Sequence, residues 1–429
     1  MRIGIFIDDY QQKTVNGVVT STRNYKRALE ELGHEVWLVA PTAKDEIDDE
    51  PHVIRLKSFP TPPMKLLEKR RGAITYPGFE KKFDEYHFDV VHTMTEFLVG
   101  MLGHNVAKRQ GIPHIDTFHT LYAEMFQAFP VDVFLTTLLN SFVTPLSFRK
   151  KPINVLKKEL FDTATRADLI KEKNWQISNI FLNETSFVVV PSRHLRAKLV
   201  ARGLTTPSAV LPNGLFTEFY RENHGTKLPF RRQKNDFWVA TVGRISGEKR
   251  QEILVDALSD LPANVKAVIV GDGPAMDDLR DRVRAKNLGA RVILAGAKER
   301  AAVADILQNV DAFAMTSYHF DNQPMVILEA IASGLPVVYC DSDLREGLAP
   351  AKFSANGELR NAARANALLT DGIDGEAFAK ALKKLAAEKS LRETLSQNSR
   401  KLSQNFDSLK LAKKLVKIYQ TATPLARKP

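Results

Sequence analysis

Short β-rich runs alternate with helical stretches in two separate parts of the chain, and this repeated order constrains the fold more than any other feature. The first set runs from residues 3–7 to residues 187–192, and the second places four consecutive strand–helix pairs between residues 237 and 333. A strand followed by a helix and a further strand is typical of a parallel sheet with helices on its faces. We therefore expect an α/β protein with two such domains.

The boundary between these domains is marked by a connector. A turn-rich segment at residues 212–214 and a basic, polar stretch at 221–235 separate the two alternating sets. With 429 residues, two domains of ordinary size account for most of the chain. We predict Rossmann-like domains over residues 1–215 and 216–395, facing a central cleft. Residues 396–429 are predicted to form a C-terminal amphipathic helix that packs back on the N-terminal domain.

Composition limits the setting in which the chain can work. Cys340 is the single cysteine, so no disulfide forms within the chain, which fits a reducing, cytoplasmic compartment. The first residues predict a strand and not a secretory signal, and no apolar stretch of about 18 residues predicts a membrane-spanning helix. The net charge of +11 favours anionic partners. Because no zinc-finger, RNA-recognition or helix-turn-helix pattern is present, we do not expect nucleic acid among them.

The most informative motif places two carboxylates around the start of a predicted helix. Asp321 stands before the helix, Glu329 lies inside it eight positions later, and Pro324 suits its first turn. The start of a helix presents free backbone N–H groups, which suit phosphate or sugar oxygens. Both carboxylates can accept hydrogen bonds from hydroxyl groups. An acidic cap followed by a surface charge would give the same pattern, so the motif needs support from others.

A basic pair supplies that support. Arg244 and Lys249 follow the predicted strand 237–242, and ligands of open α/β sheets bind at the carboxyl ends of strands. A guanidinium can donate two parallel hydrogen bonds to a phosphate, and an ammonium adds a point charge. Gly271 begins a tight turn after the next strand and would let a ligand approach the backbone.

In the first domain the candidates also follow strands. Asn16 and Gly17 come after the first strand, where a glycine permits close approach of a phosphate. His119 lies just past a strand end, and His92 and Glu96 lie near the end of another. A histidine in this place can hydrogen-bond a sugar hydroxyl, although a lone histidine is more often structural.

Taken together, these residues resemble glycosyltransferase family 4, the retaining enzymes of the GT-B fold. The resemblance covers nearly the whole chain and is strongest over residues 191–338. The family carries a Glu-x7-Glu signature, and Asp321 to Glu329 has its spacing, with Asp in place of the first Glu. The shorter side chain keeps the carboxylate, so we expect activity with an altered sugar contact.

The resemblance implies roles for the candidate residues. Arg244 and Lys249 would bind the donor diphosphate, Glu329 the ribose, and Gly17 would lie against the diphosphate from the acceptor-binding N-terminal domain. The predicted catalytic residues are His119 and Asp321. The predicted donor-binding residues are Asn16, Gly17, Arg244, Lys249, Gly271, Asn322, Gln323, Pro324, Met325, Val326 and Glu329. The donor would be a uridine or guanosine diphosphate sugar, with no cofactor and no metal. We interpret the Asp-x-Asp at 341–343 as a turn.

More narrowly, residues 92–97 and 117–122 resemble bacterial diacylglycerol glucosyltransferases, which implies transfer of glucose from UDP-glucose to a lipid at the cytoplasmic membrane face. A basic and apolar surface could then dock on anionic lipid, although a core helix with a solvated basic face would give the same pattern. Its apolar candidates are Phe126, Phe129, Val131, Val133, Phe134, Leu135, Leu138 and Leu139. Its basic candidates are Arg149, Lys150, Lys151, Lys157 and Lys158. Residues 60–71, with Met64, Leu66 and Leu67 among lysines and arginines, would add a second contact.

Three other hypotheses stay open at this point. The same chemistry could act on a soluble sugar, a sugar phosphate or phosphatidylinositol. A GT-B sugar-nucleotide epimerase would convert the donor without an acceptor, but it needs an acid–base set that the sequence does not identify. A catalytically inert binding protein would bind nucleotide without turnover.

Overall fold

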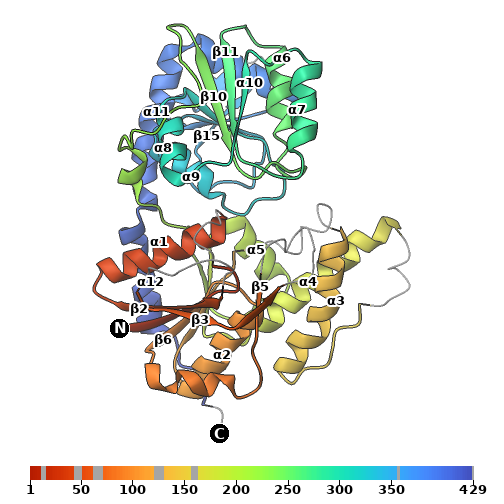
Figure 1. The fold of residues 1–429 in the computed structure, drawn as a ribbon, viewed down its shortest axis with the longest axis vertical. Helices are drawn as coiled ribbons and strands as arrows, with labels where there is room; N and C mark the ends of the chain where they lie inside the picture. Colours follow the sequence, from red (N-terminus) through yellow and green to blue (C-terminus); the bar gives the residue numbers. More distant parts are fainter. Residues whose placement is uncertain are drawn as a thin grey trace. The chain divides into compact units, whose positions relative to one another are not determined.

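The structure is a computed structural model that describes residues 1–10, 16–42, 51–60, 71–119, 130–155, 163–354 and 358–427. The chain divides into two compact units, which Figure 1 colours in sequence order. The first unit comprises Met1–Gly214 together with Ser408–Pro429, and the second comprises Leu215–Asp407. The chain therefore leaves the first unit after residue 214 and returns to it at residue 408.

The first unit is built on a parallel sheet with the strand order β3-β2-β1-β6-β7-β8-β9. Its elements are β1 (Arg2–Phe6), α1 (Gly17–Glu31), β2 (Glu35–Pro41), β3 (Val53–Leu56), β6 (Val90–Thr93), α2 (Leu98–Gln110), β7 (His114–Thr117), β8 (Phe187–Val190), α5 (Arg193–Ala201) and β9 (Ser208–Val210). A short antiparallel pair, β4 (Ser58–Pro60) and β5 (Arg71–Ala73), and a 3-10 helix (Phe79–Tyr86) are added to it. The parallel α/β domain expected from the alternating pattern is confirmed.

A pair of helices interrupts the alternation of the first unit. These are α3 (Pro130–Ser147) and α4 (Thr163–Leu182), which lie side by side between β7 and β8 in sequence. Among the described elements, α4 is the main packing partner of α3. Phe148 and Phe181 join the pair to the body of the unit, where they pack edge to face with His104 and His114.

The C-terminal helix α12 (Ser408–Thr421) belongs to the first unit. It packs on α1 through the buried side chains of Leu411, Leu415 and Tyr419, and its lysines face solvent. The hydroxyl group of Tyr419 lies 2.6 Å from Nδ1 of His92 on β6. Residues 396–407, which the sequence analysis grouped with this helix, instead belong to the second unit as the end of α11 and a 3-10 turn.

The second unit has a sheet with the order β12-β11-β10-β13-β14-β17-β15-β16, parallel except for the edge pair β15–β16. Its strands are β10 (Phe237–Val242), β11 (Val265–Val270), β12 (Val292–Gly296), β13 (Ala312–Met315), β14 (Val337–Tyr339), β15 (Pro350–Phe353), β16 (Leu359–Arg360) and β17 (Ala367–Leu369). Its helices are the 3-10 turn η4 (Thr217–Tyr220), α6 (Glu252–Ser259), α7 (Met276–Ala285), α8 (Arg300–Gln308), α9 (Met325–Ala332), α10 (Gly375–Ala387) and α11 (Lys389–Ser403).

Both faces of this sheet are covered by helices. Along β10, Phe237 and Val239 join the core under α6, α7 and α10, whereas Trp238 and Ala240 join the core under α8 and α9. Successive side chains of a strand point to opposite faces, so a run that is apolar at every position predicts a strand buried on both sides. This explains why the strand predicted at 237–242 forms with the same bounds.

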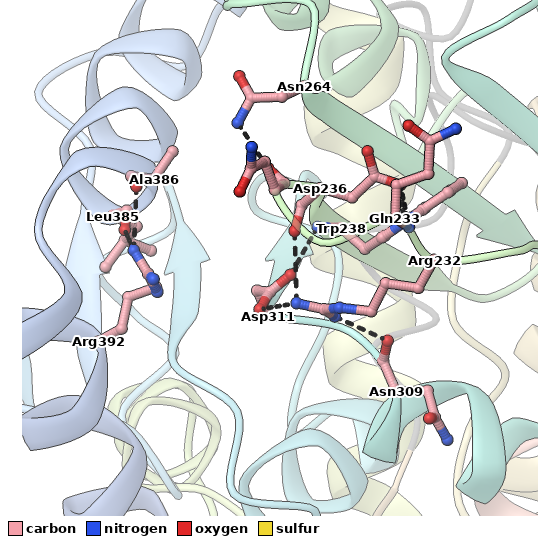
Figure 2. A network of polar contacts seen from close by, with 11 residues as sticks. Arg232, Gln233, Asp236, Trp238, Asn264, Asn309, Asp311, Leu385, Ala386 and Arg392 are labelled. Atoms are coloured by element: carbon pink, nitrogen blue, oxygen red, sulfur yellow. Dashed lines mark hydrogen bonds and ion pairs between the residues drawn. The ribbon is translucent and has the colours of Figure 1, made fainter.

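A polar network holds the amino ends of these strands (Figure 2). Arg232 donates to Oδ1 of Asp311 at 2.6 Å and to the carbonyl of Asn309 at 3.1 Å. The other carboxylate oxygen of Asp311 accepts from the backbone N–H of Trp238 at 2.7 Å, which joins β10 to the start of β13. Since ligands of such sheets bind at the opposite, carboxyl ends, we assign this network a role in stability.

Candidate active site

The second unit has a topological switch point between β10 and β13. These strands are neighbours, and the chain continues from β10 towards β11 and β12 on one side, and from β13 towards β14 on the other. The loops that follow β10 and β13 therefore diverge at the carboxyl edge of the sheet, which is where open α/β sheets bind ligands in a crevice. Arg244 and Lys249 lie on the first loop and Asp321 on the second, so the fold brings the two strongest sequence motifs to one place.

An ion pair joins the two motifs. Nζ of Lys249 lies 2.5 Å from Oδ1 of Asp321, and Ser317 donates to Oδ2 of Asp321 at 2.6 Å. The ammonium group also lies 5.0 Å from the ring centroid of Phe320. Thr316 donates to the backbone carbonyl of Lys249 at 2.7 Å and fixes the loop. The sequence assigned these residues to different parts of a donor, whereas the structure pairs them with each other.

Glu329 is held by two residues that the sequence motifs did not reveal. The hydroxyl group of Tyr220 donates to Oε1 of Glu329 at 2.7 Å, and Nε of Arg300 donates to the same hydroxyl group at 3.1 Å. Burial raises the pKa of the Glu329 carboxyl, and the hydrogen bond from Tyr220 and the charge of Arg300 oppose that rise. No short motif could have found Tyr220, because it reaches α9 only through tertiary packing.

The start of α9 carries the residues predicted to act through their backbone. Asn322 and Gln323 are buried before it, and Pro324 takes the N-cap position, one residue earlier than the first turn that the sequence suggested. The side chain of Met325 packs in the core, and Val326 is partly buried against the same cluster. The first N–H groups of a helix lack partners within the helix, so this end can donate to an oxyanion.

Two glycines in the loops beside this site, Gly271 and Gly243, have different surroundings. Gly271 has φ +143°, and a Cβ there would lie 1.8 Å from the carbonyl oxygen of Gly243. The close packing of these two loops therefore accounts for Gly271, without any ligand. A Cβ at Gly243 would meet no described atom within 4 Å, so the space beside this second glycine is open. The carbonyl of Arg244 accepts from the side chain of Gln251 at 2.7 Å, which positions that loop.

In the first unit, Asn16 and Gly17 lie at the amino end of α1. Oδ1 of Asn16 accepts from the backbone N–H of Val19 at 2.8 Å, which makes Asn16 the N-cap, and Gly17 is the first residue of the helix. Nδ2 of Asn16 lies 3.3 Å from a carboxylate oxygen of Asp9. This capping bond gives Asn16 a structural role. The amino end of α1 follows β1, as the sequence predicted.

His119 follows β7 and is partly buried. Burial lowers its pKa to about 3, so its imidazole is neutral at physiological pH. After β1 of the same sheet, Asp8 accepts from Thr95 at 2.6 Å and from the backbone N–H of Val99 at 2.8 Å, and so occupies the start of α2. Burial also raises the pKa of Asp116, to about 7.

Glu96 is a further carboxyl of this region, and it is partly buried. Its pKa is raised well above the ordinary value by burial and by the charges of Asp116 and Asp8. It lines a small pocket between α3, α4 and the loop after β6, together with Phe97, Thr144, Asn174 and Ser178. The sequence pointed to Glu96 but not to Asp8, which follows β1, or to Asp116, which lies within β7.

One group of side chains in the described part of the chain has the composition of a metal site. Ligand atoms of His319, Asp341 and Asp343 lie within 4.8 Å of one another. The Asp341 carboxylate already accepts from the backbone N–H groups of His319 at 2.8 Å and Asp343 at 3.0 Å. The second of these bonds closes the turn that the sequence predicted at 341–343.

The fold and this site define a class of protein. Two Rossmann-like α/β units, with a basic and acidic crevice at the switch point of the second, are the features of a GT-B glycosyltransferase. Residues 15–219 match the family described as Glycosyltransferase Family 4, and residues 227–402 match Glycosyl transferases group 1. The chain therefore belongs to glycosyltransferase family 4. Its family 4 domain is followed by a glycosyl transferases group 1 domain, and the protein is a hexosyltransferase that depends on a nucleotide sugar.

Similar proteins extend over most of the chain. An alpha-monoglucosyldiacylglycerol synthase of Acholeplasma laidlawii is 28% identical over 378 residues, covering 84% of this chain and 86% of the relative. The enzyme of the same name from Streptococcus pneumoniae is 27% identical over 407 residues, covering 90% and 83%. Among solved structures, Anabaena HepE in complex with UDP has a TM-score of 0.64 at 17% identity, covering 98% of this chain and all of that one. This last similarity shows the GT-B fold.

Proposed function

We propose that the protein transfers glucose from UDP-glucose to diacylglycerol at a membrane surface, with retention of the sugar's configuration. The observation that carries the proposal is the similarity, over 84% and 90% of the chain, to two alpha-monoglucosyldiacylglycerol synthases. The switch-point crevice supports it, because cationic and acidic groups there suit the diphosphate and the hydroxyl groups of such a donor.

The donor would be held by the second unit. Arg244 and Lys249 would neutralise the diphosphate, for which Lys249 must exchange its bond to Asp321 for one to a phosphate oxygen. Asp321 would then be released to accept hydrogen bonds from the sugar. Oε1 of Glu329 is engaged by Tyr220, which leaves Oε2 for the ribose hydroxyl groups. This exchange couples donor binding to the release of the sugar-binding carboxylate.

In the reaction, the bond between the anomeric carbon and the diphosphate breaks as a bond to the acceptor oxygen forms on the same face. A phosphate oxygen of the leaving UDP takes the acceptor's proton, so no protein nucleophile is needed. The main catalytic contribution is stabilisation of the leaving diphosphate by Arg244, Lys249 and the start of α9. His119, neutral because of its lowered pKa, would orient a sugar hydroxyl and not supply a proton.

We further propose that the reaction needs no metal and that the protein works as a peripheral protein on the cytoplasmic face of the membrane. No helix in the described part of the chain has both the length and the apolar character needed to span a bilayer. An anionic membrane surface suits the net charge of +11.

The test is product formation from a panel of radiolabelled nucleotide sugars, with diacylglycerol in anionic vesicles as the acceptor. We expect a labelled glycolipid from UDP-glucose and none from the other donors. Labelling from a GDP-sugar alone would overturn the donor assignment. Consumption of donor without labelled lipid would overturn the acceptor, and conversion of donor in the absence of any acceptor would identify an epimerase.

A further inference from the structure

Helix α3 carries its large apolar side chains on the outside. Leu135, Leu139, Phe142 and Leu146 have exposed fractions of 46%, 63%, 47% and 59%. Their spacing of four, three and four residues places them on one face of the helix. We call these four residues the α3 ridge. Leu135 and Leu139 are among the residues predicted from the sequence to dock on lipid, whereas Phe142 and Leu146 are not and extend the ridge to the end of the helix.

The inward face of the same helix is largely polar, although Val133 and Pro145 are buried there too. Thr137, Ser141 and Thr144 are buried against the rest of the unit. The side chain of Asn174 on α4 donates to the hydroxyl oxygen of Thr137 at 2.8 Å, and Ser141 donates to the carbonyl of Leu138 at 2.7 Å. A helix on the surface of a water-soluble protein has the opposite arrangement, with its apolar face inward. Because its outer face is apolar and its inner face largely polar, α3 is suited to contact a medium less polar than water on its outer side.

The charges around the ridge indicate what this medium is. Asp132 is the only charged residue within α3. Directly after the helix come Arg149, Lys150 and Lys151, which are all exposed. Lys150 pairs with Glu184 at 2.7 Å, whereas Arg149 and Lys151 form no ion pair within the described part of the chain. Apolar side chains beside basic ones fit a bilayer that contains anionic lipids.

We infer that the α3 ridge is the membrane-docking element of this protein, lying in the surface of an anionic bilayer with its apolar side chains among the acyl chains. Leu135 and Leu146 are about 16 Å apart along the helix, which is too short to cross a hydrocarbon core of about 30 Å but suits a helix lying parallel to the surface. Arg149 and Lys151 then meet lipid phosphates at one end. This inference rests on the proposed function for its reason to dock on a membrane.

The other segments proposed for membrane contact are not needed for this inference. Phe126, Phe129, Lys157, Lys158 and residues 61–70 lie outside the described residues. Of the remaining apolar candidates, Val133 is buried and Phe134 and Leu138 are half-buried. The helical period thus divides the apolar run into residues that face the protein and residues that face outward.

The experiment measures binding of the full-length protein to vesicles without donor or acceptor, so that its result does not depend on catalysis. Vesicles of phosphatidylcholine, with and without phosphatidylglycerol, are sedimented with the parent protein and with a Leu139→Gln, Phe142→Gln double variant. Glutamine keeps the helical propensity. Val200→Gln is the matched control, since Val200 on α5 is 47% exposed and lies outside the ridge.

We expect the double variant to lose at least tenfold in binding to anionic vesicles, with an unchanged melting temperature, and the control to bind like the parent. Equal binding by the double variant would overturn the inference. So would a change from dimer to monomer with vesicle binding unaffected, because the ridge would then be an interface between two copies. If binding falls but no glycolipid is ever made, the docking element stands and the proposed function fails.

A second measurement does not rely on loss of binding. Cys340 is buried and is the only cysteine, so Leu139→Cys in a Cys340→Ser background gives one labelling position. An environment-sensitive fluorophore there should shift its emission to shorter wavelength when anionic vesicles are added. The same label at Val200→Cys should not respond. An unchanged spectrum at position 139 in a protein that binds the vesicles would overturn the inference.

Discussion

Nζ of Lys249 and Oδ1 of Asp321 lie 2.5 Å apart and join the loops that follow two neighbouring strands, β10 and β13. This pair occupies the place where a donor diphosphate and sugar are proposed to bind. Its two charges neutralise each other before the donor arrives, and Ser317 holds the second carboxylate oxygen. The crevice is therefore organised in advance, and a phosphate must compete with Asp321 for Lys249.

The first prediction concerns this pair. Lys249→Ala should lower kcat/KM for the donor by a hundredfold or more, about 3 kcal/mol, because a charge that stabilises the leaving diphosphate is removed. Steady-state kinetics with a range of donor concentrations measure this effect. Asp321→Asn is the comparison: it also breaks the ion pair, but it frees Lys249 for phosphate and should mainly weaken the sugar contact. Full turnover in a folded Lys249→Ala variant would contradict the role in the diphosphate site.

The second prediction concerns the support of Glu329. In Tyr220→Phe the hydrogen bond that lowers the pKa of Glu329 is lost, so burial should raise that pKa further. Since Glu329 must be ionised to accept ribose hydroxyl groups, the acidic limb of the kcat/KM profile should move to higher pH. The donor KM should rise severalfold while kcat changes less. A pH profile that coincides with the parent's would show that Tyr220 has only a structural role.

A third prediction concerns metal. Activity should persist after treatment with EDTA, because Arg244, Lys249 and the start of α9 supply the positive charge that a metal would otherwise provide. The assay is run with and without added Mg²⁺ or Mn²⁺. Should EDTA abolish turnover, His319 and Asp343 become the candidates to test, and His319→Ala would then have to reproduce the loss.

The fourth prediction concerns the charge of His119. Its pKa of about 3 is lowered by burial, so the imidazole stays neutral as the pH falls from 8 to 5. Nuclear magnetic resonance of isotope-labelled histidine should show no titration of this ring in the folded protein over that range. In the urea-unfolded chain the same ring should titrate near its ordinary value of about 6.5. A titration near 6.5 in the folded state would make His119 a candidate acid, contrary to the proposed role.

The fold could be predicted wherever the pattern of apolar residues along the chain identifies a strand or a helix by itself. Phe237, Val239, Trp238 and Ala240 are all apolar, as a strand buried on both faces requires, and β10 has the predicted bounds. The segment 130–182 was harder, because its apolar residues suggested a docking surface without showing which side of a helix each would take. The polarity of α3 follows from packing against α4, and that contact is not encoded in any local pattern.

The candidate site was predictable to the same extent. Arg244, Lys249, Asp321 and Glu329 lie in short motifs after strands, and parallel strand order brings such motifs to one edge. Their mutual contacts were not predictable, since the pairing of Lys249 with Asp321 depends on which strands are neighbours. For Gly271 the structure provides a packing reason where the sequence suggested ligand contact.

The return of α12 to the first unit makes the second unit an insertion between two pieces of the first. During synthesis, the second unit is complete once Asp407 has emerged from the ribosome, whereas the first still lacks the helix that covers Tyr25 and His92. The first unit therefore cannot complete its fold until α12 has been synthesised. A premature stop codon near residue 407 would therefore damage the N-terminal domain and spare the domain next to the break.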